Sequence, residues 1–171
     1  MFVKFADKAI QNRRNVFPIQ HKTIFNTAKY ICYLIPFLFS AYIYMTALHA
    51  NQPILRYIEQ NPIITILFVI AMVQPFVGVA ISLGNKALTE YSSHVLWSFI
   101  ILAVSEFLMG NILVCILLTW GIFLIKKQRL SRKTEPVIFS GKIPTLLFGL
   151  TTSLSLLSLI ITWVFLRISG I

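Results

Sequence analysis

Acidic residues are scarce in this chain, and the motifs that many enzymes depend on are missing. Only 5 Asp and Glu stand against 15 Lys and Arg in 171 residues. Five acids leave almost no material for paired-carboxylate or two-metal catalysis. The sequence also contains no GxSxG motif, no HExxH motif and no Gly-rich phosphate-binding loop. We therefore expect that the protein is not an enzyme.

Cysteine is scarcer still. The two cysteines, Cys32 and Cys115, both lie inside apolar runs, and the sequence has no CxxC pair and no Cys–His cluster. A buried free cysteine behaves as a small hydrophobic residue. The sequence therefore predicts neither a disulfide framework nor a metal site, and we expect no cofactor.

Polar residues are in the minority, because apolar residues make up 57% of the chain and the mean hydropathy is +0.82. A soluble domain has too little interior to bury that fraction. The apolar residues gather in four runs, at about 30–50, 63–83, 95–125 and 143–166, each long enough to cross a bilayer as a helix. The sequence predicts an all-α integral membrane protein, a multi-pass bundle of four hydrophobic helices. We expect it in a bacterial cytoplasmic membrane.

A basic segment, residues 1–29, precedes a single transmembrane domain over 30–171. The apolar run begins only near Tyr30, so we expect no cleavable signal peptide. Four apolar residues of the segment fall on one helical face and favour a short amphipathic helix on the membrane surface. They are Phe2, Phe5, Ala6 and Ala9. A solvated basic tail is an equally good interpretation.

Most of the cations flank the apolar runs, which indicates a membrane partner and not nucleic acid. Lys and Arg beside a span contact anionic lipid headgroups, so the bilayer surface is the expected partner. The residues expected to make these contacts are Arg13, Arg14, Lys126, Lys127, Arg129, Arg132 and Lys133.

The distribution of Lys and Arg gives four simple spans almost no preferred orientation. One side would hold six cations from residues 1–29 with Lys86 and Arg167, eight in all, and the other Arg56 with six after Ile125, seven in all. The cytoplasmic side normally has a clear excess. Three explanations remain open: the rule is weak here, the second apolar run is re-entrant, or copies insert in opposite orientations.

Two of the runs contain features that bear on their path. Gln74-Pro75, at the centre of Ile63–Leu83, predicts a kinked span or a re-entrant hairpin. In Val95–Ile125, Trp97 and Trp120 are 23 residues apart, which is about 34 Å of helix. Because Trp favours the two membrane interfaces, we interpret this run as a single span with a helical extension.

Glu106 is the one acid inside an apolar run. A carboxyl group at that depth is costly and indicates a structural hydrogen bond or a function. No cation lies in any other run, so we expect polar groups such as Gln74 or the hydroxyls of the last helix to satisfy it. Asn111 would lie on a different face of a continuous helix, and Gly110 would let another helix approach. We predict a proton or substrate site from Glu106, Gln74 and Asn111.

The last run carries hydroxyl groups at spacings of four, three and four residues, which place them on one helical face. They are Thr151, Ser155, Ser158 and Thr162. Such a stripe packs helices together or lines a polar path, and we favour packing.

Two functions are consistent with these features. On base rates we expect an accessory or assembly subunit of a larger membrane complex. The alternative is a small proton-coupled transporter or channel-like oligomer, with Glu106 as the titrating group. In both cases a chain this small is expected to associate with other membrane subunits or with copies of itself.

Overall fold

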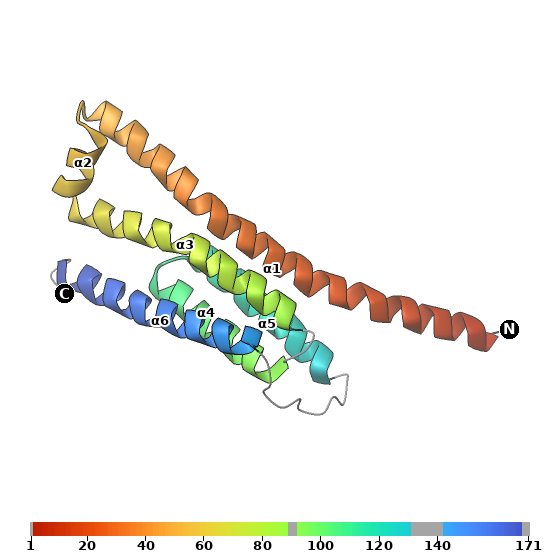
Figure 1. Ribbon diagram of the computed structural model, residues 1–171. Coiled ribbons are helices and arrows are strands. Elements are labelled where there is room, and N and C mark those ends of the chain that lie inside the picture. Colours follow the sequence, from red (N-terminus) through yellow and green to blue (C-terminus); the bar gives the residue numbers. More distant parts are fainter. Residues whose placement is uncertain (1, 89–91, 131–141, 169–171) are drawn as a thin grey trace.

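The described part of the chain is entirely helical (Figure 1). The computed structural model describes the backbone of residues 2–88, 92–130 and 142–168, and the side chains of residues 22–88, 95–127 and 145–168. The helices are α1 Phe2–His49, α2 Ile54–Gln60, α3 Pro62–Ala87, α4 Ser92–Leu108, α5 Ile112–Leu130 and α6 Lys142–Ile168.

Three of these helices are apolar enough and long enough to cross a membrane. The stretches are Lys22–His49 in α1, Pro62–Ala87 in α3 and Thr145–Ile168 in α6, while Val95–Leu108 in α4 is apolar but shorter. The expected all-helical class and the presence of helices compatible with a membrane are confirmed for the described residues. Four single helices, one for each apolar run, are not what the structure shows.

The first apolar run is part of a much longer helix. α1 continues from Phe2 to His49, so no break separates the basic segment from the run at residue 30. Neither Gly nor Pro occurs between His21 and Ile35, and nothing there stops a helix. The side chains of Phe2, Phe5, Ala6 and Ala9 lie outside the described residues, and their surface position stays a prediction.

The second apolar run forms one uninterrupted helix. α3 passes from Pro62 to Ala87 with Pro75 inside it, so the re-entrant hairpin considered at Gln74-Pro75 is wrong. Proline fixes φ near a helical value and removes only one backbone donor. In membrane helices, neighbouring groups commonly compensate for that loss.

The third apolar run is the one that folds back, and the prediction of a single span over Val95–Ile125 is wrong. α4 ends at Leu108 and α5 begins at Ile112, forming a helical hairpin (Figure 1). Trp97 and Trp120 therefore lie on different helices, both on the same side of the turn. Their separation in sequence does not measure a membrane thickness.

The turn of the hairpin depends on Gly110, which has φ +76°. Glycine adopts this left-handed backbone without steric cost. Gly110 N–H donates to Phe107 O (3.0 Å) and Asn111 N–H donates to Glu106 O (2.9 Å). This pair of bonds is a Schellman motif, which ends a helix. The Asn111 carbonyl then accepts from Cys115 N–H (3.1 Å) and starts α5.

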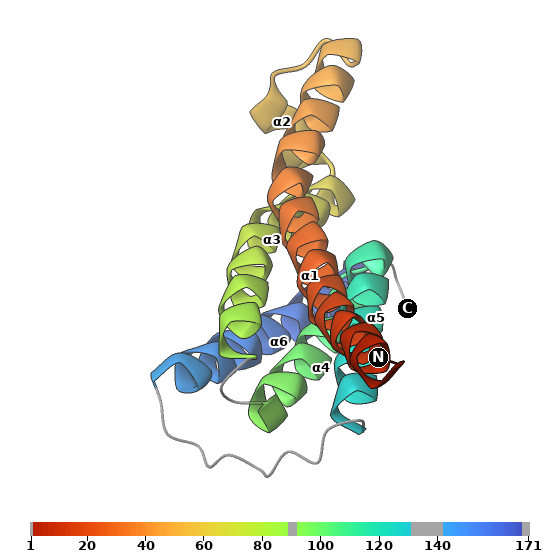
Figure 2. The same cartoon turned by 90° about the vertical axis from the view of Figure 1, so that its right-hand side faces the viewer.

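The helices pack around the hairpin (Figures 1 and 2). α1 contacts α3 and α5, α4 contacts α5 and α6, and α3 contacts α4 and α6. The short α2 connects α1 to α3 at one end of the molecule, the end toward which α6 also runs (Figure 1). We call this the α2 end. The opposite end, where α3 finishes and α5 finishes, is called the basic end because Lys86 and Lys127 lie there.

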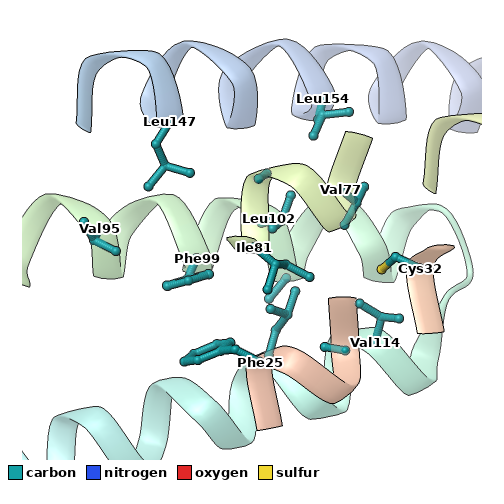
Figure 3. Close-up of a cluster of buried hydrophobic side chains, with 14 of the residues drawn as sticks. Phe25, Cys32, Val77, Ile81, Val95, Phe99, Leu102, Val114, Leu147 and Leu154 are labelled. Atoms are coloured by element: carbon teal, nitrogen blue, oxygen red, sulfur yellow. The ribbon is translucent and has the colours of Figure 1, made fainter. Parts of the chain in front are cut away.

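Two phenylalanine rings hold four helices together near the basic end (Figure 3). Phe25 of α1 and Phe99 of α4 stack with their centroids 4.5 Å apart, and both are buried. A Cβ added at Gly121 of α5 would lie 2.6 Å from Phe25 Cζ, and one at Gly84 of α3 would lie 2.5 Å from Phe99 Cζ. Both glycines are therefore required for this close approach.

Candidate functional site

The hairpin turn brings the three predicted site residues together. Asn111 Nδ2 donates to Glu106 Oε2 at 2.8 Å and to Gln74 Oε1 at 3.0 Å. Glu106 comes from the last turn of α4, Asn111 from the turn itself and Gln74 from α3. One amide group therefore joins both sides of the hairpin turn to the neighbouring helix. We call these three residues the tip cluster.

Two members of the tip cluster are withdrawn from any surface. Glu106 is 0% exposed and Gln74 is 1% exposed. Glu106 Oε1 and Gln74 Nε2 have no hydrogen-bond partner among the described residues. Buried polar atoms are nearly always paired in native proteins, so an unpaired acceptor and an unpaired donor in one cluster indicate a place where chemistry or rearrangement can occur.

The tip cluster lies at the middle of α3. Measured along the helix, Gln74 is about 18 Å from Pro62 and about 20 Å from Ala87 at 1.5 Å per residue. The hairpin thus enters the bundle from the basic end and turns at half its depth. No Lys, Arg or His occurs in residues 63–83, 95–125 or 145–166, so among the described residues Glu106 has an amide donor in Asn111 but no cationic partner.

Other neighbours of Glu106 contribute weakly polar groups. Ser105, which is 0% exposed, donates to Ile101 O within its own helix at 3.0 Å. Cys32 of α1 is also fully buried, near Glu106. Neither group is a cation, and a buried charge is costly without an oppositely charged partner.

The hydroxyl stripe of α6 lies against α4 but makes mostly local bonds. Thr151 and Ser158 are buried, and each donates within α6, to Leu147 O at 3.0 Å and to Ser155 O at 2.8 Å. Thr162 Oγ1 donates to Ser158 O at 2.8 Å and also reaches Leu108 O of α4 at 3.2 Å. These bonds agree with a role in helix packing, and none of them reaches Glu106.

The predicted headgroup contacts are only partly described. Lys126 and Lys127 are exposed at the basic end. The side chains of the others lie outside the described residues: Arg13, Arg14, Arg129, Arg132 and Lys133. Contact with lipid therefore stays a prediction for all seven residues.

The part that sequence reasoning missed is the way Asn111 meets Glu106. In a continuous helix the two side chains point to different faces, but the left-handed Gly110 reverses the chain between them. The signal was present as Gly-Asn, a common helix end. It lies inside a run of 31 apolar-rich residues, which exceeds the roughly 20 that one span needs.

Relatives supply no further guidance on the tip cluster. Comparisons with protein-family models, curated proteins and solved structures found no match to this chain. The chemistry of the cluster is therefore the available guide to function. A buried carboxyl group that accepts from Asn111, which also donates to Gln74, can exchange a proton or can form purely structural hydrogen bonds.

Proposed function

We propose that the protein crosses the membrane three times, through α1, α3 and α6, and that α4 and α5 form a re-entrant hairpin. α4 has 17 residues, about 25 Å of helix, and the apolar part of α5, Ile112–Ile125, is about 21 Å long. Both are shorter than the roughly 30 Å hydrocarbon core. At the non-helical turn Met109 is buried and Asn111 is half-buried and bonded to Gln74 of α3, whereas Gly110 is exposed. Most backbone groups of the turn are hydrogen-bonded within the chain, which is what non-helical backbone within a membrane requires.

The charges support this topology. Among the described side chains, Arg56 and Arg167 are the cations toward the α2 end, and five lysines lie toward the basic end: Lys22, Lys29, Lys86, Lys126 and Lys127. Because cytoplasmic segments carry the excess of Lys and Arg, the basic end faces the cytoplasm. The hairpin returns the cations after Ile125 to the side of the N-terminus, so insertion in opposite orientations is not needed.

Within this topology, the function that the geometry supports best is proton-coupled transport or proton conduction through Glu106. The carrying observation is a fully buried carboxyl group, with one unpaired oxygen, at the tip of a hairpin that ends halfway along α3. Ionisable residues inside membrane spans are rare, and they commonly belong to a proton or ion pathway. Interrupted helices that meet at the midplane are a common construction for transport sites.

The chemistry assigned to the tip cluster is a reversible protonation. Glu106 takes a proton from a hydronium ion, forms the neutral carboxylic acid and releases water. Asn111 and Gln74 position the carboxyl group and supply donors to its anionic form. Since one chain of this size offers little room for an enclosed path, we propose that it works as an oligomer or beside another membrane subunit.

The test measures proton flux by purified protein in liposomes that contain a pH-sensitive dye. Glu106→Gln keeps the size and the hydrogen-bonding capacity of the side chain but cannot titrate, so flux should fall by at least about tenfold. Glu59→Gln is the matched control, because Glu59 is exposed on α2 and the same chemical change there should leave flux unaltered. Equal flux from wild type and Glu106→Gln, or no flux from wild type, would reject the transport proposal.

The second candidate function is an accessory subunit that packs against the helices of a larger membrane complex. Its support is α1. In the most apolar membrane-length stretch of α1 only 17% of the residues are buried, against 39% in that of α3. Large residues are exposed there, such as Phe37 (70%) and Leu38 (61%). Lipid alone can cover this apolar surface, and a helix of another membrane subunit can also pack on it.

A deletion strain separates the two candidates. An accessory subunit predicts that a membrane complex loses mass on native gels when the chain is absent, and that Glu106→Gln restores it fully. Substituting Phe37 and Leu38 with alanine should then weaken assembly while leaving the fold intact. Unchanged complexes in the deletion strain would remove this candidate.

A further inference from the structure

We propose that the tip cluster takes a proton in preference to an alkali-metal cation, and that Gln74 is the residue that determines this preference. The inference rests on the proposed transport function, because it specifies the ion that the same site would carry. It is argued from the numbers of oxygen acceptors and hydrogen-bond donors around Glu106.

Side-chain oxygens are too few for a metal cation. Hard cations are held by several oxygen ligands that replace their hydration shell. In the two fully buried side chains, Glu106 Oε2 and Gln74 Oε1 already accept from Asn111 Nδ2. Of the three oxygens of these two side chains, only Glu106 Oε1 lacks a donor from the described residues. A proton needs one such oxygen, whereas a sodium ion needs several.

Backbone carbonyls at the turn are also engaged. In discontinuous membrane helices, freed carbonyls are the usual ligands of Na⁺. Here six of the seven carbonyls from Ser105 to Asn111 accept hydrogen bonds at 2.9–3.2 Å from backbone N–H groups or from a hydroxyl of α6, and the Met109 carbonyl is the one without a donor among the described residues. The acceptors are the carbonyl oxygens of Ser105, Glu106, Phe107, Leu108, Gly110 and Asn111.

The side-chain amide of Gln74 gives a second reason for the site to prefer a proton over a metal cation. Its Nε2 carries two hydrogens, is buried and has no partner among the described residues. The positive end of the amide opposes a metal cation at the tip cluster. The same group can donate to Glu106 Oε1 when the carboxyl is ionised, and to a water molecule when it is protonated. Gln74 Nε2 therefore has a hydrogen-bond acceptor in both protonation states of Glu106.

The remaining titratable neighbours do not supply a competing charge. On the helices that contact α4, residues 63–83 of α3, 112–125 of α5 and 145–166 of α6 contain no Asp, Glu, Lys, Arg or His, and Lys86 and Arg167 lie beyond them near the helix ends. Cys115 of α5 is half-buried, and Cys32 of α1 is fully buried in apolar surroundings. Protonation of Glu106 is thus decided mainly by the carboxyl group and its two amide neighbours.

The experiment compares thermal unfolding of the purified chain in detergent with NaCl, KCl or choline chloride at equal ionic strength. The wild type should unfold at the same temperature in all three salts. Gln74→Glu places a second carboxyl group beside Glu106, and it should gain at least about 3 °C in Na⁺ over choline, because a ligand that binds only the folded state stabilises it. A wild-type gain in Na⁺ or K⁺ that Glu106→Gln abolishes would overturn the inference.

A second measurement keeps the inference testable if Gln74→Glu does not fold. Infrared difference spectra between acidic and alkaline buffer should show a protonated carboxyl band that is absent from Glu106→Gln and unaltered by Na⁺. Loss of that band on adding Na⁺ would also contradict the inference. Neither readout requires flux, so a failed transport assay would reject the function without deciding the ion preference.

Discussion

The second and third apolar runs make an instructive comparison, because each contains a residue that disfavours helix and only one of them turns back. α3 continues through Pro75 from Pro62 to Ala87, whereas the third run divides at Gly110 into α4 and α5. Proline is the stronger helix breaker by intrinsic propensity, at about 3 kcal/mol against about 1 kcal/mol for glycine. Propensity alone would have placed the hairpin in the wrong run.

The difference lies in what each residue permits. Proline disturbs a helix but keeps φ in the helical range, so the chain can continue in the same direction. Glycine at φ +76° lets the last carbonyls of α4 be satisfied from within the turn. Asn111 then fixes the new direction by bonding α3. A reversal between packed apolar helices therefore needs compensation for freed backbone groups more than it needs a helix breaker.

The largest effect on this comparison is expected from Asn111→Leu. It would leave Glu106 Oε2 and Gln74 Oε1 buried without their donor, at about 1–3 kcal/mol for each acceptor. Unfolding by a denaturing detergent should show the loss in stability. Asn26→Leu on the exposed face of α1 is the control, and an equal effect of both substitutions would show that the tip cluster does not hold the hairpin.

A somewhat smaller effect is expected from Gly110→Val. A side chain at a left-handed backbone position costs about 1–2 kcal/mol, and β-branching adds crowding. Gly149→Val, at an exposed helical glycine with nothing near its Cβ position, is the matched control. Accessibility of a cysteine placed at Lys127 should stay on the side of Lys86 in both variants. Labelling from the opposite side in the wild type would contradict the hairpin in the membrane.

Alanine substitutions at the glycines that pack against Phe25 and Phe99 should show which aromatic contacts are rigid and which can adjust. Gly84→Ala and Gly121→Ala press on rings that are buried and stacked, at about 1–3 kcal/mol for overpacking. Gly78→Ala meets Tyr33 at 2.6 Å, but that ring is only half-buried and can move aside. The unfolding midpoint should fall less for Gly78→Ala, and a reversed order would place the rigid contact elsewhere.

The smallest effect is expected from Pro75→Ala. Because α3 is already continuous, the substitution restores one backbone donor and should change stability by less than about 1 kcal/mol in either direction. Cysteines introduced at Arg56 and Lys86 should still label from opposite sides of the membrane. If they label from the same side in the wild type, α3 does not cross.

The sequence was sufficient for some parts of this fold and insufficient for others. Hydropathy located the membrane-length stretches of α1, α3 and α6 but did not separate α4 from α5. Glu106 was identifiable as a candidate because one charge in an apolar run is conspicuous. Gln74 was identifiable for a similar reason, as a polar side chain at the centre of a span. These inferences need only the local solvent preference of each residue.

The hairpin depended on an interaction between distant parts of the chain. Asn111 and Gln74 are 37 residues apart, and no local sequence pattern indicates that they are in contact. Helical periodicity assumes an unbroken helix, so it assigned Asn111 to the wrong face once the turn at Gly110 was overlooked. Gly84 and Gly121 were missed for the same reason, since their role appears only when Phe25 and Phe99 are placed.

The 37-residue separation of Gln74 and Asn111 also has a consequence for biosynthesis. At about 5–20 residues per second, the ribosome adds Asn111 roughly two to seven seconds after Gln74. During that interval Gln74 has been synthesised but Asn111 has not. The side-chain amide of Gln74 must therefore be hydrated or bonded elsewhere. Final docking of the α4–α5 hairpin against α3 is therefore a late event, because its bond to Gln74 forms only after Asn111 has been added.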